Sequence, residues 1–316
     1  MMTATAILMM GPTAVGKTEL AMQLCQQTPC EIISVDSALV YRNMNIGTAK
    51  PSPQELTQYP HHLINIRNPD EPYSVAEFCT DALDLMKQIC QRGNTPLLVG
   101  GTMMYFNALQ YGLTDLPSAN EAIRSDIEAQ AKVEGWQKIH QQLAAIDPVS
   151  AKRIHPNDRQ RLQRALEVYK ITGQSLTRLQ HNNQKQGLPY KTIKIVLATN
   201  DRQWLHERIA KRFNQMIEMG FEQEVRSLTE NYQLTPDFPS MRAVGYRQMW
   251  QYIKGELSLA EMTEKGITAT RQLAKRQFTW LRSEKEAHWF DALDRDKFKL
   301  INELVQRNQD DRHKKI

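Results

Sequence analysis

The first 115 residues alternate between short apolar runs and a longer segment with helical spacing. The apolar runs occupy residues 6–10, 32–35 and 96–99, and their length is typical of buried strands. Between them, residues 73–91 have the spacing of an amphipathic helix, with Ser74 at its N-terminal cap. Strands that alternate with helices favour a parallel sheet, which binds ligands at the carboxyl ends of its strands. The pattern therefore predicts an α/β core.

The pattern then becomes helical. Residues 118–180 have helical periodicity without a β-branched run, with breaks at Asp147-Pro148 and Pro156-Asn157. The polar stretch 181–187 predicts a loop, and the strand pattern returns at residues 193–198. We therefore expect a helical insertion inside the α/β core. Its boundaries would place the core at 1–117 and 189–316 and the insertion at 118–188.

The last part of the chain is again helical. Residues 201–230 predict a long helical region that is broken at Gly220. Its core positions would be Leu205, Ile209, Phe213, Met216 and Ile217. The end of the chain, including the charged residues 310–315, predicts a helix that frays into a tail without an assignable role.

A phosphate-binding motif follows the first apolar run. Residues 11–18 read Gly-Pro-Thr-Ala-Val-Gly-Lys-Thr and fit G-x-x-x-x-G-K-[ST] between a strand and a helix. In such a loop, backbone N–H groups and the helix N-terminus converge on phosphate oxygens. Lys17 would reach a terminal phosphate, and the Thr18 hydroxyl would hold Mg²⁺. The motif predicts a P-loop NTPase-like parallel sheet flanked by helices, and a di- or triphosphate ligand.

Composition narrows the class of protein. The 316 residues are 41% hydrophobic and 24% charged, which is ordinary for a globular protein with ample core. No apolar run approaches the ~20 residues of a membrane helix, and the N-terminus lacks the basic start of a signal peptide. The four cysteines form no C-x-x-C pair, so neither a zinc site nor a disulfide framework is indicated. We expect a cytoplasmic protein.

The net charge of +5 is unevenly distributed. Residues 1–114 have a net charge of −3, whereas residues 115–316 have +8. A basic part joined to a phosphate-binding part favours a polyanionic partner. Solvated helices can produce the same excess.

Two polar clusters follow the other predicted strands. Asp36-Ser37 follows residues 32–35, and Gly100-Gly101-Thr102 follows residues 96–99, at the strand ends that the phosphate loop shares. The later strand ends without the acid that a hydrolase uses to position metal or water, which favours a transferase. Asp36 could then accept a proton from a second substrate, or it could simply cap a turn. Thr102 could cap a helix or line a substrate channel.

Three segments combine arginine with aromatic or amide side chains, at residues 158–164, 242–248 and 271–282. Within the last, Arg271, Lys275 and Arg282 share one helical face. Such mixtures suit RNA, because cations bind phosphates, rings stack on bases and amides contact base edges. Each segment could also be a solvated helix face.

Six motifs together resemble the bacterial tRNA dimethylallyltransferases of the tRNA isopentenyltransferase family. They are the phosphate loop and residues 34–38, 45–50, 98–105, 242–248 and 274–282. The similarity extends from the first strand to about residue 290 with the motifs in the family's order, and no key position departs from it.

The resemblance implies transfer of a dimethylallyl group from dimethylallyl diphosphate to the exocyclic amine (N6) of an adenosine. That adenosine lies 3′ of the anticodon in tRNAs that read codons beginning with U. Asp36 would be the general base, and Lys17, Thr18, Thr102 and Arg124 would complete the catalytic set. The diphosphate would bind, with Mg²⁺ at Thr18, to Gly11, Pro12, Thr13, Ala14, Val15, Gly16, Lys17 and Thr18.

The resemblance also implies contacts with the anticodon stem-loop, and we expect a monomer. The implied tRNA-binding residues are Asp36, Ser37, Ala38, Leu39, Thr102, Arg124, Gln160, Arg161, Leu162, Gln163, Arg164, Met241, Arg242, Ala243, Val244, Gly245, Tyr246, Ala274, Lys275, Arg276, Gln277, Phe278, Thr279, Trp280 and Leu281.

Two other functions fit parts of the sequence. A small-molecule P-loop kinase would bind ATP at the loop and use Asp36 to activate a hydroxyl, but it leaves the basic segments unexplained. A non-catalytic RNA-binding ATPase would explain the basic segments and leave Asp36 without a role.

Overall fold

The computed structural model describes residues 4–182 and 187–313. The contacts divide the chain into two compact units, one formed by Met1–Leu109 with Pro189–Ile316 and the other by Gln110–Leu188. The boundary expected at residue 118 thus lies eight residues inside the second unit. Among the described residues, no helix has the length and apolar character to cross a membrane.

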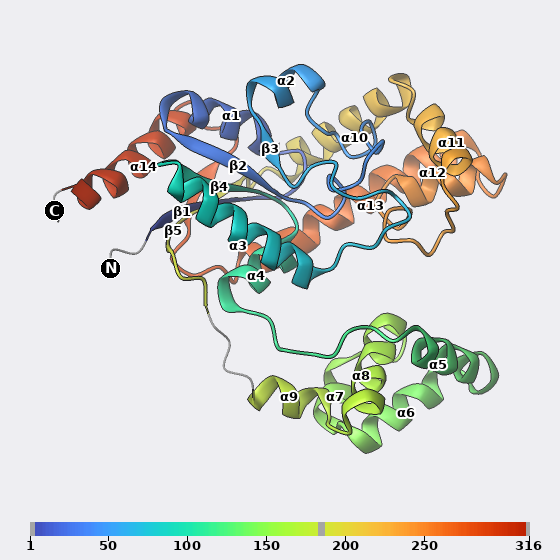
Figure 1. Ribbon diagram of the computed structural model, residues 1–316. Helices are drawn as coiled ribbons and strands as arrows, with labels where there is room; N and C mark the ends of the chain where they lie inside the picture. Colours follow the sequence, from blue (N-terminus) through green and yellow to red (C-terminus); the bar gives the residue numbers. More distant parts are fainter. Residues whose placement is uncertain (1–3, 183–186, 314–316) are drawn as a thin grey trace. The chain divides into compact units, whose positions relative to one another are not determined.

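The first unit contains a six-stranded sheet (Figure 1), and its strands are parallel, as the sequence predicts. Its strands are β1 (Thr5–Met10), β2 (Cys30–Val35), β3 (His61–His62), β4 (Thr95–Gly100), β5 (Lys191–Ala198) and β6 (His288–Asp291). Their order is β3-β2-β4-β1-β5-β6, so the three strands followed by the predicted polar clusters are neighbours. β3 and β6 were not predicted, because two to four residues carry too little apolar pattern.

Helices cover both faces of the sheet. The helices of the first unit are α1 (Lys17–Gln27), α2 (Pro53–Gln58), α3 (Val75–Gln91), α4 (Met103–Tyr111), α10 (Arg202–Glu218), α11 (Phe221–Asn231), α12 (Tyr246–Ile253), α13 (Leu259–Leu281) and α14 (Lys297–His313). Ile7 and Met9 of β1 pack in a core with Leu20 of α1 and Ile301 of α14, while α3 lies on the opposite face (Figure 1). Ser74 caps α3 in a capping box, as predicted.

The helix expected near the end of the chain is present as α14, which continues to His313. Ile301 and Val305 of α14 are fully buried in the same core as β1 and α1. Their four-residue spacing places both on one face of a helix, which explains why this charged sequence still folds against the sheet. Residues 314–316 lie outside the described residues.

The second unit is helical, with its own apolar core. Its helices are α5 (Glu121–Glu134), α6 (Trp136–Ile146), α7 (Pro148–Arg153), α8 (Arg159–Thr172) and α9 (Leu176–Asn182). The predicted break before Pro148 is stabilised by Asp147, whose carboxylate accepts hydrogen bonds from Ser150 N and from the amide and hydroxyl of Thr177. The prediction of a loop at 181–187 is wrong for its first two residues, because α9 continues to residue 182. Residues 183–186 of the predicted loop lie outside the described residues.

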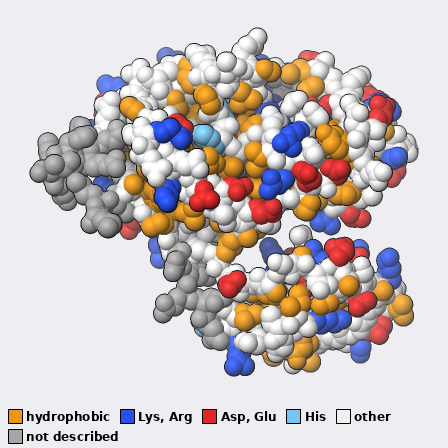
Figure 2. Space-filling model, viewed as in Figure 1, with side chains coloured by type: hydrophobic (Ala, Val, Ile, Leu, Met, Phe, Trp, Pro, Cys, Tyr) orange, Lys and Arg blue, Asp and Glu red, His pale blue; other side chains and the backbone are white. Residues whose placement is uncertain are grey.

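Charges are intermixed on one face of the protein. On the face shown in Figure 2, basic, acidic and apolar side chains alternate instead of forming one continuous basic band. The basic excess of residues 115–316 therefore has to be interpreted locally, site by site.

Candidate functional site

The phosphate-binding motif forms the turn between β1 and α1. Gly16 has φ 95° and Ala14 has φ 68°, so both adopt the left-handed conformation that bends the loop over the start of α1. Gly11 has no space for a side chain, because a Cβ there would overlap the Leu197 carbonyl oxygen of β5. The loop is thereby seated on the carboxyl ends of the central strands.

Lys17 points back into this loop. Its Nζ donates a 2.7 Å hydrogen bond to the Pro12 carbonyl. Burial lowers the pKa of Lys17 to about 7, while nearby Asp36 raises it and Arg212 lowers it. An anion bound in the loop would restore the charge of the ammonium group. The free loop is therefore a cationic site whose charge is incompletely compensated.

Two arginines of α10 complete the loop, and the sequence analysis did not find them. Arg208 Nε donates to the Ala14 carbonyl at 2.9 Å, and Arg212 Nη2 donates to Thr13 Oγ1 at 2.6 Å. Burial is the largest cause of a lowered pKa at Arg212. Their four-residue spacing beside the apolar positions of α10 was the available signal, but 194 and 199 residues separate them from their partners in the loop.

Gln277 of α13 links the phosphate loop to the end of β4. Its Oε1 accepts a hydrogen bond from Thr13 N at 2.8 Å, and its Nε2 donates to the Gly101 carbonyl at 2.8 Å. Only 7% of the residue is exposed. Both ends of its amide are thus engaged inside the protein, and its assignment as a tRNA contact stays a prediction.

Asp36 follows β2 and lies beside this loop. Its Oδ1 accepts hydrogen bonds from Ala38 N at 2.8 Å and Leu39 N at 3.3 Å. Among the described residues, no hydrogen bond engages its other carboxylate oxygen. Asp36 therefore caps a turn and keeps one oxygen available, so the two readings of its role are compatible.

Thr102 connects the ends of β2 and β4. Its Oγ1 accepts a 3.0 Å hydrogen bond from Ser37 N and lies 3.4 Å from the Ser37 hydroxyl. The polar groups that follow the two strands are thus in contact. This confirms that these strand ends converge at one edge of the sheet.

These groups line a pocket of about 430 Å³. Thr13, Asp36, Thr102 and Arg212 supply its polar groups, and further lining comes from the loop before α12 and from one face of α13. That part of the lining contains Arg242, Ala243, Val244, Tyr246, Arg276, Gln277 and Trp280. Trp280 is 42% exposed, so the lining includes an accessible aromatic ring among arginines.

Glu224 of α11 organises the loop at residues 45–48. Its carboxylate accepts hydrogen bonds from the backbone N–H groups of Asn45, Ile46 and Gly47 at 2.7–3.1 Å. The Tyr246 hydroxyl donates to the same carboxylate at 2.6 Å. Burial raises the pKa of Tyr246 well above its usual value, so the hydroxyl remains a donor. The sequence analysis did not single out Glu224.

Several predicted tRNA-binding residues have side chains in the core. Leu162, Met241, Tyr246 and Leu281 are fully buried, and Ala274 is 2% exposed. These side chains are buried within the protein, and the assignment of these residues as tRNA contacts stays a prediction. The exposed members are Ser37, Gln160, Arg161, Arg242, Lys275, Arg276, Thr279 and Trp280. The motif segments thus alternate between buried and accessible positions, as helices and turns require.

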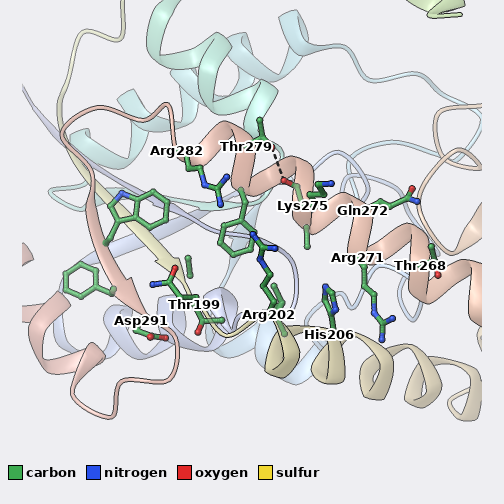
Figure 3. A pocket seen from close by; sticks show the side chains of 17 residues that line it. Thr199, Arg202, His206, Thr268, Arg271, Gln272, Lys275, Thr279, Arg282 and Asp291 are labelled. Atoms are coloured by element: carbon green, nitrogen blue, oxygen red, sulfur yellow. Dashed lines mark hydrogen bonds between the residues drawn. The ribbon is translucent and has the colours of Figure 1, made fainter.

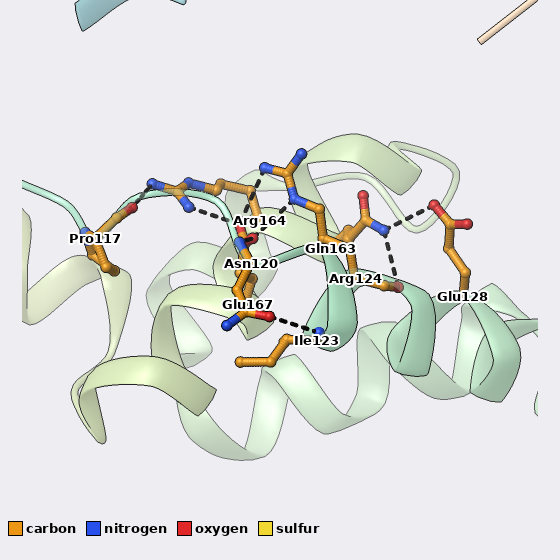
Figure 4. A network of polar contacts seen from close by, with 8 residues as sticks. All are labelled: Pro117, Asn120, Ile123, Arg124, Glu128, Gln163, Arg164 and Glu167. Atoms are coloured by element: carbon orange, nitrogen blue, oxygen red, sulfur yellow. Dashed lines mark hydrogen bonds and ion pairs between the residues drawn. The ribbon is translucent and has the colours of Figure 1, made fainter.

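In the second unit, a buried carboxylate holds two of the predicted RNA-binding arginines (Figure 4). Glu167 is completely buried and accepts from Arg124 Nε at 2.9 Å, from Arg164 Nη1 at 2.7 Å and from Asn120 N at 2.7 Å. Burial raises its pKa, but the hydrogen bonds from Arg124 and Arg164 outweigh that effect, and the pKa lies below its usual value. Gln163 donates to the Arg124 carbonyl at 3.3 Å.

The contacts of Arg124 in this network bear on its predicted role in the site. Its side chain is 34% exposed and belongs to the second unit, whereas Asp36 and Thr102 belong to the first. The expectation that Arg124 lines the same channel as Thr102 therefore stays a prediction. The part of Arg124 not engaged by Glu167 remains accessible.

The donor set at the phosphate loop fits a magnesium ion only together with a phosphate ligand. The described residues contain no cluster of three histidine, cysteine, aspartate or glutamate side chains that could hold a metal. The exposed Thr18 hydroxyl stands at the start of α1, next to Lys17. Mg²⁺ is commonly bound by one or two protein oxygens together with substrate phosphates, which this arrangement allows.

Proteins of known structure are similar to this chain in both sequence and fold. The family model described as IPP transferase matches residues 39–284. The structure of a full-length tRNA isopentenylpyrophosphate transferase from Bacillus halodurans is 37% identical, with a TM-score of 0.72 over 99% of both chains. A tRNA delta(2)-isopentenylpyrophosphate transferase from Staphylococcus epidermidis is 34% identical, with a TM-score of 0.69 over 98% of this chain and 99% of that one.

A eukaryotic protein is also similar. A eukaryotic dimethylallyltransferase acting on tRNA is 30% identical, with a TM-score of 0.78. The match covers 92% of the present chain and 75% of the eukaryotic one.

Proposed function

The chain belongs to the IPP transferase family, and we propose that its 430 Å³ pocket joins an isoprenoid diphosphate to an adenine of tRNA. It is a tRNA prenyltransferase, as the resemblance implied. We propose dimethylallyl diphosphate as the donor, and as the acceptor the N6 amine of the adenosine 3′ of the anticodon in tRNAs that read codons beginning with U. The observation that carries the proposal is the Asp36 carboxylate beside the phosphate loop in one pocket.

The loop would bind the diphosphate. Backbone N–H groups of residues 14–18, the Lys17 ammonium and the Arg212 guanidinium offer donors and positive charge to its oxygens. These groups stabilise the negative charge that grows as the C–O bond to diphosphate breaks. When bound at Thr18, Mg²⁺ would add further charge to this leaving group.

Asp36 would accept the proton of the attacking amine. The adenine N6 lone pair is delocalised into the ring, so the amine is a weak nucleophile that gains from orientation and from a base. As the N6–C bond forms and the C–O bond breaks, one N–H proton passes to the Asp36 carboxylate. The hydrogen bonds from Ala38 N and Leu39 N fix one oxygen and direct the other. Thr102 supports that turn through Ser37 N.

The adenine would enter the pocket flipped out of its stack. An adenine stacked in an RNA loop cannot reach an enclosed carboxylate, and extrusion costs a few kcal/mol. Arg242, Arg276 and Trp280 offer phosphate contacts and a stacking surface at the pocket. On the second unit, we propose that Gln160, Arg161 and the exposed part of Arg124 contact the anticodon stem-loop.

We also propose where the protein works and in what form. A tRNA substrate supports a cytoplasmic location. We propose that the protein acts as a monomer.

One assay tests the function. The protein is incubated with Mg²⁺, unmodified tRNA and either dimethylallyl diphosphate or ATP, and nucleosides are then analysed by mass spectrometry. We expect a dimethylallyl adenosine with the first donor alone, at the position 3′ of the anticodon. A phosphorylated product formed with ATP would instead support the kinase alternative, and no product with either donor would refute the proposed reaction.

A further inference from the structure

A second cavity of about 680 Å³ lies next to α13. It shares no lining residue with the pocket that contains Asp36 and uses a different face of the helix. Its other walls are the first turns of α10 and the ends of β5 and β6 (Figure 3). Carboxyl ends of parallel strands are where α/β sheets bind ligands, and the volume is in the range of small-molecule sites.

The cavity is strongly basic. Arg202, Arg271, Lys275 and Arg282 line it, and none of them forms an ion pair with any described residue. Figure 3 shows Arg271 extending from α13 toward α10, the helix that carries Arg202 and His206. Four unpaired cations in one cavity repel one another unless an anion is present.

Two further observations indicate that hydrogen-bond donors in this cavity lack acceptors. The Nε of Arg271 is buried and has no hydrogen-bond acceptor among the described residues, which is costly for an N–H donor. The single carboxylate of the lining is Asp291, and its Oδ1 accepts a 2.9 Å hydrogen bond from Leu293 N. The cavity therefore has more donors than the protein satisfies.

Aromatic rings form the other part of the lining. Phe278, Trp289 and Phe290 line the cavity, and Trp289 is 47% exposed although it lies in a strand. Planar rings next to arginines bind planar ligands, because bases stack both on indole rings and on guanidinium groups. An isoprenoid chain would favour aliphatic walls, whereas a nucleobase matches this mixture of rings, cations and the Asn200 amide.

We propose that this cavity binds a nucleoside phosphate, with its phosphate on Arg271, Lys275 and Arg282 and its base on Trp289. The site is separate from the pocket of the transfer reaction, so the inference goes beyond the proposed function. The nucleoside phosphate is either a free nucleotide or a nucleotide of an RNA chain, and the experiment below distinguishes these sources.

The test measures binding of AMP, adenosine and inorganic phosphate by calorimetry, and of anticodon stem-loop RNA by fluorescence anisotropy. All titrations use the full chain carrying Lys17→Ala, so that the phosphate loop does not contribute. We expect AMP to bind more tightly than adenosine or phosphate. Arg271→Gln and Trp289→Ala should each weaken AMP binding about tenfold, the effect of one charged hydrogen bond or one stacked base. Trp289→Phe, which keeps a ring, should lose less.

The matched control is Lys265→Gln, the same loss of charge at an exposed position of α13 that does not line the cavity. Near-normal thermal unfolding identifies the variants that remain folded. Weakened AMP binding with unchanged RNA binding assigns the site to a free nucleotide. Weakened RNA binding in both Arg271→Gln and Trp289→Ala assigns it to an RNA nucleotide.

Three results would overturn the inference. They are equal affinity for phosphate and AMP, displacement of AMP by dimethylallyl diphosphate in the Lys17→Ala background, and unchanged binding of both AMP and RNA in the cavity variants. Each is independent of the prenyl transfer assay, because that assay depends on Asp36 and the phosphate loop.

Discussion

Replacing Asp36 by Asn removes the proposed base and keeps most of its local structure. The Asn amide oxygen can still accept from Ala38 N and Leu39 N, the two hydrogen bonds that hold this turn. The other carboxylate oxygen becomes an NH₂ group, which cannot accept a proton from the adenine amine. General bases contribute about 10²–10⁴-fold, so turnover should fall by that factor, which corresponds to roughly 2.7–5.4 kcal/mol.

The assay is single-turnover transfer of a labelled dimethylallyl group to unmodified tRNA at saturating concentrations of both substrates. tRNA affinity should change far less than turnover, because phosphate contacts dominate RNA binding. Asp84→Asn, the same chemical change at an exposed position of α3, serves as the control and should retain normal transfer. Turnover of Asp36→Asn within a factor of three of the unchanged protein would refute the assignment of Asp36 as the base.

Three further predictions concern buried charged and polar residues. The pKa of Lys17 is about 7 in the free loop and should rise when a diphosphate binds. The dissociation constant for dimethylallyl diphosphate should therefore increase above pH 7, by at most about tenfold per pH unit. The same titration of the Lys17→Arg variant should show a flatter dependence on pH. Glu167→Gln leaves Arg124 and Arg164 without their carboxylate and should lower the free energy of unfolding by about 3–5 kcal/mol. Hydrogen exchange should locate the change in residues 110–188. A loss of stability as small as that of the exposed-site control Glu134→Gln would contradict this prediction. Gln277→Ala breaks the link between Thr13 and Gly101 and should weaken diphosphate binding about tenfold, with little effect on the binding of stem-loop RNA. Weakened RNA binding with unchanged diphosphate binding would instead support Gln277 as a tRNA contact.

Short-range patterns predicted much of the site. The phosphate loop was visible because its glycines, Lys17 and Thr18 are contiguous and must stand between a strand and a helix. Asp36 was found because it directly follows an apolar run, and Thr102 because only two glycines separate it from another. The carboxyl ends of parallel strands share one edge of the sheet. Both are local rules that one segment of sequence contains.

Long-range partners escaped prediction. Arg208 and Arg212 contact phosphate-loop residues that lie 194 and 199 positions before them, and Glu224 binds Ile46, which lies 178 positions before it. The spacing of Arg208 and Arg212 places them on one face of α10, but solvated charges in α10 or α11 can have the same spacing. The arginine face at Arg271, Lys275 and Arg282 was recognised, but its position in a cavity separate from Asp36 was not.

The sequence by itself determined the order of strands and helices, the phosphate loop and the acidic residue beside it, because strand and helix periodicity and turn chemistry act over a few residues. Only the tertiary structure decided which members of each motif are accessible, as Gln277 and Tyr246 show by being buried in hydrogen-bonded positions. It also decided which charges meet, as in the pairing of Glu167 with Arg124 and Arg164. The physical reason is that burial and ion pairing depend on distances between elements, and folding sets those distances through the packing of the whole core.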